Sequence, residues 1–569
     1  MITRFLSATL LAAGLSACAT VPAPLPEPQA APVRYEAGIV SAADPRAAEA
    51  GARMLRMGGS ATDAAIATML ALTVVEPQSS GIGGGGFYMR SGADGALETL
   101  DGRERAPMGA TPAWFLDTDG KPLGYREAVI GGLSVGVPGN IALAAEAHER
   151  HGKLAWADLF APAIELARDG WELTPRGHEY LSRFAERAGH DPAARALYFD
   201  AAGEAKPVGT RLTNPDLART LEMIASRGAG AFYTGDFATG LAAKVASETP
   251  HAGAMSANDI ATYRATWREP VCGMYRTYRI CGMGPPSSGA TTVIAILGQL
   301  ERFDLAALGA NSPAAWHLFA ESQRLAYADR ERFLADADFI AVPVTELIDP
   351  TYLAKRSALI APNSTMATAE PGLTLPPPDG MEPPEAGTSH FVTVDRAGNA
   401  VTYTSTIEGP FGSGLMYRGF PLNNELTDFS FVPEEGGHPI ANRVEGGKRP
   451  RSSMAPTFVY DSEGQLLLAI GAAGGGTIPV QVARALIGFI DWNLPIGEAL
   501  ALPVVYSPGD NVTVEDGPEA AALIAALEAL GHKDVSARRL PIKANAVSLT
   551  AGTLTGAADP RSEGKAVGE

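Results

Sequence analysis

The feature that most constrains this chain is an abrupt change of pattern at Thr388. Residues 376–384 are rich in proline and glycine, which resist regular structure. From Thr388 onward, apolar and polar residues alternate as in a half-buried strand. If the Gly387–Thr388 bond were cut, Thr388 would carry a hydroxyl and a free α-amine with an ordinary pKa of about 8. Such an amine can take the proton of its own hydroxyl, so Thr388 is a candidate nucleophile. A plain linker before an ordinary strand is the alternative.

The strands after this junction predict a partner for Thr388. Two strand patterns flank a turn at residues 395–399, where glycine and asparagine favour a reversal. If Val394 faces Ala400 across this turn, the antiparallel register places Thr406 opposite Thr388. A second hydroxyl would then lie beside the candidate nucleophile, whereas a slip of one residue would remove it.

The first residues indicate export. Arg4 precedes a mostly apolar run at 6–15, which is too short to span a bilayer and ends in small residues before Cys18. This ending resembles a bacterial lipoprotein signal, in which Cys18 becomes the lipidated first residue. An ordinary signal peptide with an incidental cysteine is the alternative. We expect a signal peptide at 1–17, a lipidated Ala/Pro tether at 18–34, and a periplasmic protein anchored to a bacterial membrane, with the outer membrane favoured.

Composition excludes two classes of partner. The net charge of -18 argues against nucleic acid, because phosphate binding requires a basic face. The nine histidines are scattered without companions at metal-ligand spacing, so we expect no catalytic metal. The chain is 46% hydrophobic, which is ample for a large core.

Two glycine-rich stretches could imitate a nucleotide-binding loop. The first, at 81–86, follows a helix pattern and opens a strand, the reverse of the order such a loop needs. The second, at 471–476, follows a predicted strand at 466–470 and precedes a helix that begins near Pro479. Successive glycine amides at such a turn suit an oxyanion as well as a phosphate, so this stretch alone does not decide between them.

Cys272 and Cys281 are predicted to lie on a hairpin. A two-residue turn at Arg276 and Thr277 would put them directly opposite on paired strands, where a disulfide fits. An oxidising exported setting favours the bridge, and two buried thiols are the alternative.

The remaining pattern predicts further elements. A strand at 38–42 precedes a helix at 47–57, and Ser60 with Asp63 forms a capping box for a second helix that runs to about Thr73. That helix is apolar on nearly all sides, which predicts burial. Residues 130–335 are mostly helical, with helices expected at 141–151, 156–169 and 314–333.

Arg103 follows a predicted strand at 97–100. An arginine in this position can bind a carboxylate through two hydrogen bonds, although a solvated arginine is equally consistent with the local sequence.

Five ordered blocks together resemble the γ-glutamyltranspeptidase (glutathione hydrolase) family of N-terminal-nucleophile hydrolases. The blocks are 76–86, 101–104, 285–289, 388–390 and 451–456, and residues 558–564 also look like the family's C-terminal segment. The resemblance implies an α+β fold, a four-layer αββα sandwich. It also implies a proenzyme that cuts itself into a large subunit, 35–387, and a small subunit, 388–569, which form one fold.

The resemblance implies a role for each matched residue. Thr388 would be both the self-cleaving residue and the nucleophile on γ-glutamyl amides such as glutathione, with the acyl group passed to water or to an amino acid or peptide amine. No cofactor is implied. The matched partners are Thr406 beside the nucleophile, Arg103, Ser452 and Ser453 for the donor α-carboxylate, Glu425 and Asp428 for its α-ammonium, and Gly474 and Gly475 for the oxyanion.

Two departures from the family pattern stand out. Glu408 occupies a position where well-known members have asparagine, which adds an acid to the ammonium site. Residues 433–447, where many members carry a lid, are short and lack Phe, Tyr and Trp. An open pocket could admit larger acyl donors.

Two other functions remain compatible with the sequence. The first is a related acylase that removes glutaryl groups from β-lactam side chains, or an enzyme acting on poly-γ-glutamate. Glutaryl lacks an α-ammonium, so Glu425 and Asp428 favour a γ-glutamyl donor. The second is a non-catalytic, surface-anchored binding protein, which an intact Gly387–Thr388 bond would support.

Overall fold

The computed structural model describes residues 35–373, 387–550 and 552–569. The expected signal peptide, Cys18 and the tether to residue 34 lie outside the described residues, as does most of the proline-rich run before Gly387. None of the helices in the described ranges combines the length and apolar composition needed to cross a bilayer.

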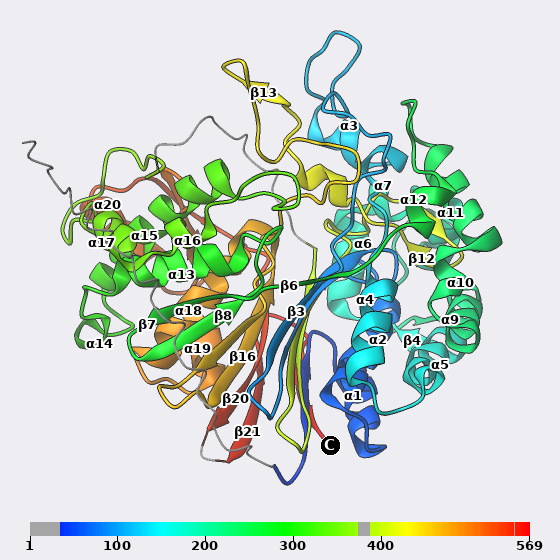
Figure 1. The fold of residues 1–569 in the computed structure, drawn as a ribbon, viewed down its shortest axis with the longest axis horizontal. Helices are drawn as coiled ribbons and strands as arrows, with labels where there is room; N and C mark the ends of the chain where they lie inside the picture. The colour runs from blue at the N-terminus through cyan, green and yellow to red at the C-terminus, as the bar shows by residue number, and fades with distance from the viewer. Residues whose placement is uncertain (1–34, 374–386, 551) are drawn as a thin grey trace, which may run out of the picture.

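Two antiparallel sheets pack face to face at the centre of the molecule (Figure 1). The first sheet has the order β22 (Lys565–Gly568), β1 (Ile39–Ala42), β9 (Ser389–Val394), β10 (Ala400–Thr406), β2 (Gly85–Ser91), β3 (Leu97–Asp101) and β6 (Thr266–Arg268). The second has the order β21 (Thr553–Ala558), β20 (Lys543–Thr550), β16 (Leu466–Ala473), β15 (Thr457–Tyr460), β8 (Tyr278–Gly282) and β7 (Val271–Tyr275). Both sheets contain strands from before and after residue 388, and these strands are interleaved in the first sheet, so the two predicted subunits would contribute to the same sandwich.

Helices cover the outer face of each sheet and complete the predicted αββα sandwich (Figure 1). The first sheet is covered by α1 (Pro45–Arg56), α2 (Ala61–Val75) and α4 (Asn140–His151), and α5 (Ala161–Asp169) packs against α2. The second is covered by α13 (Gly289–Leu300), α18 (Ile478–Ile490) and α19 (Ile496–Ala501), and α15 (Pro313–Phe333) packs against α13. The fold expected from the resemblance is therefore confirmed.

Shorter elements surround this sandwich. The helices are α3 (Tyr125–Val129), α6 (Pro175–Arg183), α7 (Ala185–Ala188), α8 (Pro192–Tyr198), α9 (Pro215–Arg227), α10 (Gly230–Tyr233), α11 (Gly235–Ala246), α12 (Ala257–Ala261), α14 (Leu305–Leu308), α16 (Val344–Leu347), α17 (Pro350–Ser357) and α20 (Ala520–Ala529). The strands are β4 (Trp171–Glu172), β5 (Arg211–Leu212), β11 (Met416–Tyr417), β12 (Phe420–Pro421), β13 (Glu434–Glu435), β14 (His438–Pro439), β17 (Val505–Tyr506), β18 (Asn511–Glu515) and β19 (Lys533–Arg538).

Helix α2 is the buried scaffold beneath β9 and β10. The predicted capping box forms: the Ser60 hydroxyl accepts from the Asp63 N–H, and the Asp63 carboxylate accepts from the Ser60 N–H at 2.8 Å. Every residue of α2 is buried, as its apolar composition predicts. The helix continues to Val75, two residues beyond the expected end, and it places Glu76 beside the start of β9, where its carboxylate accepts from the Ser389 hydroxyl.

The register predicted for the β9–β10 hairpin is confirmed. Val394 pairs with Ala400 and Ser389 pairs with Ser405, which leaves Thr388 facing Thr406. The cysteine hairpin also forms as drawn from the sequence, since Cys272 pairs with Cys281 and a disulfide joins them.

Strand β16 is longer than expected. We predicted that it would end at Ile470, but it continues through Gly471 to Ala473. Residue 471 is a glycine because a side chain there would meet the imidazole of His390: a Cβ would lie only 2.4 Å from the His390 Cε1 atom. This glycine serves close contact between the two sheets rather than a turn.

Candidate active site

Thr388 lies immediately before β9, and its polar atoms are held from two sides. Its Oγ1 is 3.0 Å from the Oγ1 of Thr406, and its main-chain N–H donates to the Ser79 carbonyl at 3.0 Å. The residue is only 4% exposed. The hydroxyl and the nitrogen that would become the α-amine are therefore both fixed in a buried setting.

The backbone at Thr388 is strained. Its φ of 102° lies in a region that a β-branched residue rarely adopts, and such a conformation costs about 1–3 kcal/mol. Gly387, just before it, is pressed against the Glu408 carbonyl, where a Cβ would lie 1.8 Å from the oxygen. Only glycine fits there, which accounts for the Gly-Thr sequence at the junction.

A buried cluster of opposite charges contains three of the predicted substrate-binding residues. The Arg103 guanidinium is paired with Glu425 and with Asp428, and its Nη2 also donates to the Arg451 carbonyl at 2.8 Å. Both acids lie on the short 3-10 helix Glu425–Asp428, which Leu426 and Phe429 anchor to an apolar cluster with Trp114. The structure therefore brings together a cation and two acids that are far apart in the sequence.

Ser452 and Ser453 follow the Arg451 carbonyl that accepts from Arg103, so the backbone links them to the charged cluster. The Ser453 hydroxyl accepts from Arg330 at 2.6 Å. The Ser452 hydroxyl accepts from the Met454 N–H at 3.2 Å, and both serines are buried.

Glu408 connects the hydroxyl pair to the charged cluster. Its N–H donates to Thr406 Oγ1 at 2.8 Å, and its carboxyl group accepts from the side-chain amide of Asn424. Burial, reinforced by Asp428, raises the pKa of Glu408 to about 8. Glu408 is therefore largely protonated at neutral pH and adds negative charge to the cluster only in alkaline solution.

Gly474 and Gly475 form the turn that ends β16. Their φ angles of 125° and 58° require glycine, and a Cβ on Gly474 would lie 2.1 Å from the Pro541 carbonyl oxygen. Strand β16 packs against β9, which brings this turn to the same part of the molecule as Thr388. The oxyanion role of the two amides stays a prediction.

Glu104 is a buried acid that our sequence reasoning missed as a site candidate. In the part of the chain that the structure describes, neither of its carboxyl oxygens has a hydrogen-bond partner. Burial raises its pKa to about 8, although Arg103 acts in the opposite direction. Its place directly after Arg103 in the 101–104 block was the available signal. Because the folded pKa exceeds the ordinary value, this group's contribution to stability is full at acid pH and is lost as pH rises toward 8.

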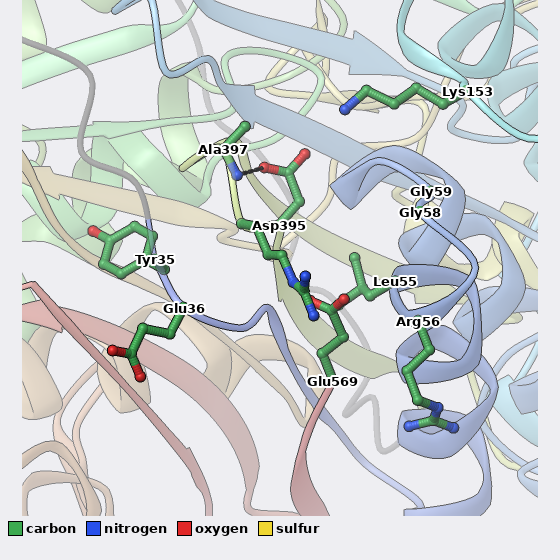
Figure 2. A pocket seen from close by; sticks show the side chains of 11 residues that line it. Tyr35, Glu36, Leu55, Arg56, Gly58, Gly59, Lys153, Asp395, Ala397 and Glu569 are labelled. Atoms are coloured by element: carbon green, nitrogen blue, oxygen red, sulfur yellow. Dashed lines mark hydrogen bonds and ion pairs between the residues drawn. The ribbon is translucent and has the colours of Figure 1, made fainter.

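The cavity in Figure 2 is not this site. It has a volume of about 640 Å³ and lies around Asp395 and Glu569. Asp395 follows the far end of β9, so the strand separates it from Thr388 by roughly 20 Å at about 3.3 Å per residue. Arg396 forms an ion pair with Glu569 at 2.7 Å, which ties the β9–β10 turn to the residue that follows β22.

No group of three or more His, Cys, Asp or Glu within the described ranges could hold a metal ion.

Comparisons with known proteins show the family to which the chain belongs. A family model described as Gamma-glutamyltranspeptidase matches residues 47–569. The chain is 36% identical over 553 residues to the glutathione hydrolase proenzyme of Bacillus subtilis (strain 168), covering 93% of this chain and 91% of the relative. It is also 36% identical over 559 residues to the acylase ACY 1 proenzyme of Pseudomonas sp. (strain V22), covering 96% and 97%.

Solved structures give the same result. The cephalosporin acylase from Bacillus halodurans matches with a TM-score of 0.82 at 28% identity, covering 96% of this chain and 99% of that one. The Helicobacter pylori gamma-glutamyltranspeptidase matches with a TM-score of 0.56 at 37% identity, covering 58% and 94%. The fold is that of the N-terminal-nucleophile hydrolases. Within that class, the chain belongs to the gamma-glutamyltranspeptidase family.

Proposed function

We propose that this chain is a self-cleaving γ-glutamyl hydrolase and transpeptidase whose nucleophile is Thr388. The observation that carries the proposal is the placement of the Thr388 hydroxyl 3.0 Å from Thr406 Oγ1, with its main-chain nitrogen held on the Ser79 carbonyl. The names of the relatives, glutathione hydrolase proenzymes among them, support glutathione and related amides as donors.

Self-cleavage follows from the strained junction. The Thr388 Oγ1 attacks the Gly387 carbonyl carbon, and the C–N bond breaks as the hydroxyl proton passes to the Thr388 nitrogen. Water then hydrolyses the resulting ester, which leaves a carboxylate on Gly387 and a free amine on Thr388. The products are the large subunit, 35–387, and the small subunit, 388–569. Release of the positive φ at Thr388 favours the forward direction.

Donor turnover uses the same atoms. The α-amine takes the proton of Oγ1 as this oxygen attacks the γ-amide carbon, and the leaving amine then receives the proton. Backbone N–H groups of Gly474 and Gly475 would stabilise the oxyanion, an interaction worth about 3 kcal/mol per donor. The acyl ester passes to water or to an amino acid or peptide amine.

The charged cluster suits the head group of a γ-glutamyl donor. Its α-carboxylate would bind Arg103, Ser452 and Ser453, and its α-ammonium would bind Glu425 and Asp428. In the structure Arg103 pairs with the two acids directly. A zwitterionic head would give Arg103 a carboxylate partner and give the two acids an ammonium partner, so the donor leaves no charge of the cluster without a partner. Glu408 would add a third acid on the ammonium side when it is ionised.

An acylase acting on glutaryl groups is the second candidate. It is favoured by the acylase relatives and by the β13–β14 hairpin, which is exposed and carries no Phe, Tyr or Trp side chain to cover a pocket. Rates on γ-glutamyl and glutaryl p-nitroanilide distinguish the two candidates. A preference for γ-glutamyl of tenfold or more supports our proposal, and a glutaryl preference would overturn it.

Thr388→Ala tests the nucleophile directly. We expect a single uncut chain without hydrolase activity, whereas Thr388→Ser, which keeps a hydroxyl, should still be cut. Cleavage of the alanine variant at the same bond would remove Thr388 from the mechanism.

Anchoring through Cys18 completes the proposal. The basic start, short apolar run and small residues before Cys18 support lipidation and a periplasmic location. Cys18→Ser should release the protein from the membrane fraction and abolish incorporation of labelled palmitate. Unchanged labelling would refute the anchor.

A further inference from the structure

A buried ion pair lies beside the proposed nucleophile. The ammonium of Lys543 on β20 is 2.8 Å from the Glu76 Oε2 atom, and the two side chains are 2% and 4% exposed. Lys543 also donates to the Ser389 hydroxyl at 3.2 Å and to the Ser79 hydroxyl at 3.4 Å. The Ser389 hydroxyl in turn donates to Glu76 at 2.6 Å. The donor-binding cluster does not use these four side chains.

This network contacts the residues on both sides of the Thr388 main-chain nitrogen, which would become the α-amine. The Ser79 carbonyl accepts from the N–H of Thr388, and the Ser79 hydroxyl touches Lys543. On the other side of Thr388, the next residue, Ser389, is bound by both Lys543 and Glu76. The pair therefore contacts Ser389, the next residue in the chain, and Ser79, whose carbonyl holds the Thr388 nitrogen.

The same lysine reaches the glycine turn through its backbone. Lys543 pairs with Ala473, the residue before Gly474, in the β16–β20 ladder. Its N–H donates to the Gln481 side chain at 3.3 Å, and that amide donates back to the Ala473 carbonyl at 2.8 Å. Lys543 thus links the surroundings of the Thr388 nitrogen with the glycine turn that is proposed to stabilise the oxyanion.

Each member of the pair acts on the pKa of the other. Burial alone would raise the pKa of Glu76, but Lys543 and Arg176 outweigh it and hold that pKa below its usual value. Burial lowers the pKa of Lys543, and Glu76 opposes this effect. Arg176 on α6 and Asp44 at the start of α1 are the further charges that act on the pair. On the Thr406 side of the nucleophile, Glu408 is the nearby titratable group.

We propose that Lys543 and Glu76 are positioning residues that fix the Thr388 α-amine and balance the charge around it. This inference rests on the proposed function of Thr388 as an N-terminal nucleophile. Each member neutralises the effect of the other on the amine: Lys543 alone would disfavour the ammonium form, and Glu76 alone would favour it. Removing one member therefore shifts the pH at which the amine becomes a free base, and the direction depends on which member is removed.

The test is the acid limb of the pH profile of kcat/KM for γ-glutamyl p-nitroanilide. It compares the processed wild-type enzyme with Glu76→Gln, Lys543→Met and the double variant. Glu76→Gln should lower the apparent pKa of the acid limb, and Lys543→Met should raise it, each by about 0.5–1 pH unit. The double variant, which leaves no unpaired charge, should return to within about 0.3 unit of wild type.

The outcomes separate the two claims. Suppose that the wild-type enzyme is cut and active. If the two single variants then shift the acid limb in the same direction, or do not shift it, the proposed role of the pair is overturned and the proposed function stands. An uncut and inactive wild-type chain would overturn both. If Lys543→Met does not accumulate in folded form, Lys543→Arg takes its place and should keep the wild-type limb, while Glu76→Gln must still shift it downward.

Discussion

Replacing Thr406 by valine isolates the hydroxyl that the structure places against the nucleophile. Valine keeps the shape and the strand preference of threonine but removes Oγ1. In the native structure this atom lies 3.0 Å from Thr388 Oγ1 and accepts from the Glu408 N–H at 2.8 Å. Thr406 is 1% exposed, so water cannot replace either interaction without entering the core.

The two lost interactions affect different quantities. The buried Glu408 N–H loses its acceptor, which should lower the free energy of unfolding by about 1–3 kcal/mol. The nucleophile loses a hydrogen bond worth about 0.5–1.5 kcal/mol, a factor of roughly 2 to 13 in the rate of each step that uses it. We therefore expect slower self-cleavage and slower donor hydrolysis, together with moderate destabilisation.

The matched control is Thr404→Val on the same strand. Thr404 is fully buried, and its hydroxyl lies 2.9 Å from His390 Nδ1, away from Thr388. Precursor made in a cell-free system is followed on denaturing gels, and denaturant unfolding is measured on the purified proteins. Thr404→Val should lose stability but be cut at the wild-type rate. The reasoning is refuted if Thr406→Val is cut at the wild-type rate, or if both variants slow cleavage equally.

Three further predictions concern the junction and the charged cluster. Gly387→Ala should block or greatly slow self-cleavage, because its Cβ would lie 1.8 Å from the Glu408 carbonyl oxygen; normal processing of this variant on a gel would contradict the packing. Arg103→Lys keeps the charge but loses the two-pronged geometry, so KM for the γ-glutamyl donor should rise about tenfold, a cost of about 1.4 kcal/mol; an unchanged KM would remove Arg103 from the donor site. Glu104→Gln should flatten the fall in unfolding free energy between about pH 5 and pH 8, since one proton contributes a slope of up to about 1.4 kcal/mol per pH unit; an unaltered slope in urea titrations would show that Glu104 is ionised when folded.

Local signals in the sequence predicted much of the central hairpin. The Ser60–Asp63 capping box and the turn between Val394 and Ala400 depend on residues close together in the chain, and both form as expected. The pairing of Thr388 with Thr406 follows from that turn alone, because each strand residue fixes the next.

The parts that could not be predicted depend on contacts between distant segments. Glu76 and Lys543 are 467 residues apart, and neither stretch of sequence indicates the other as its partner. In the sequence, Gly471 looked like part of a turn. In the structure it lies within β16, and the close approach of His390 from the other sheet explains why a glycine occupies that strand position. The charged site residues were located by their resemblance to family motifs, while their direct pairing around Arg103 appears only in three dimensions.

The measurement that tests the central claim most directly is a denaturing gel of the purified protein with N-terminal sequencing of the smaller band. We expect two fragments, and the smaller one should begin Thr388-Ser389-His390 and end at Glu569. A single uncut chain, or a small fragment that begins elsewhere, would contradict the claim that Thr388 becomes an N-terminal nucleophile. The uncut result would instead support a non-catalytic binding protein with this fold.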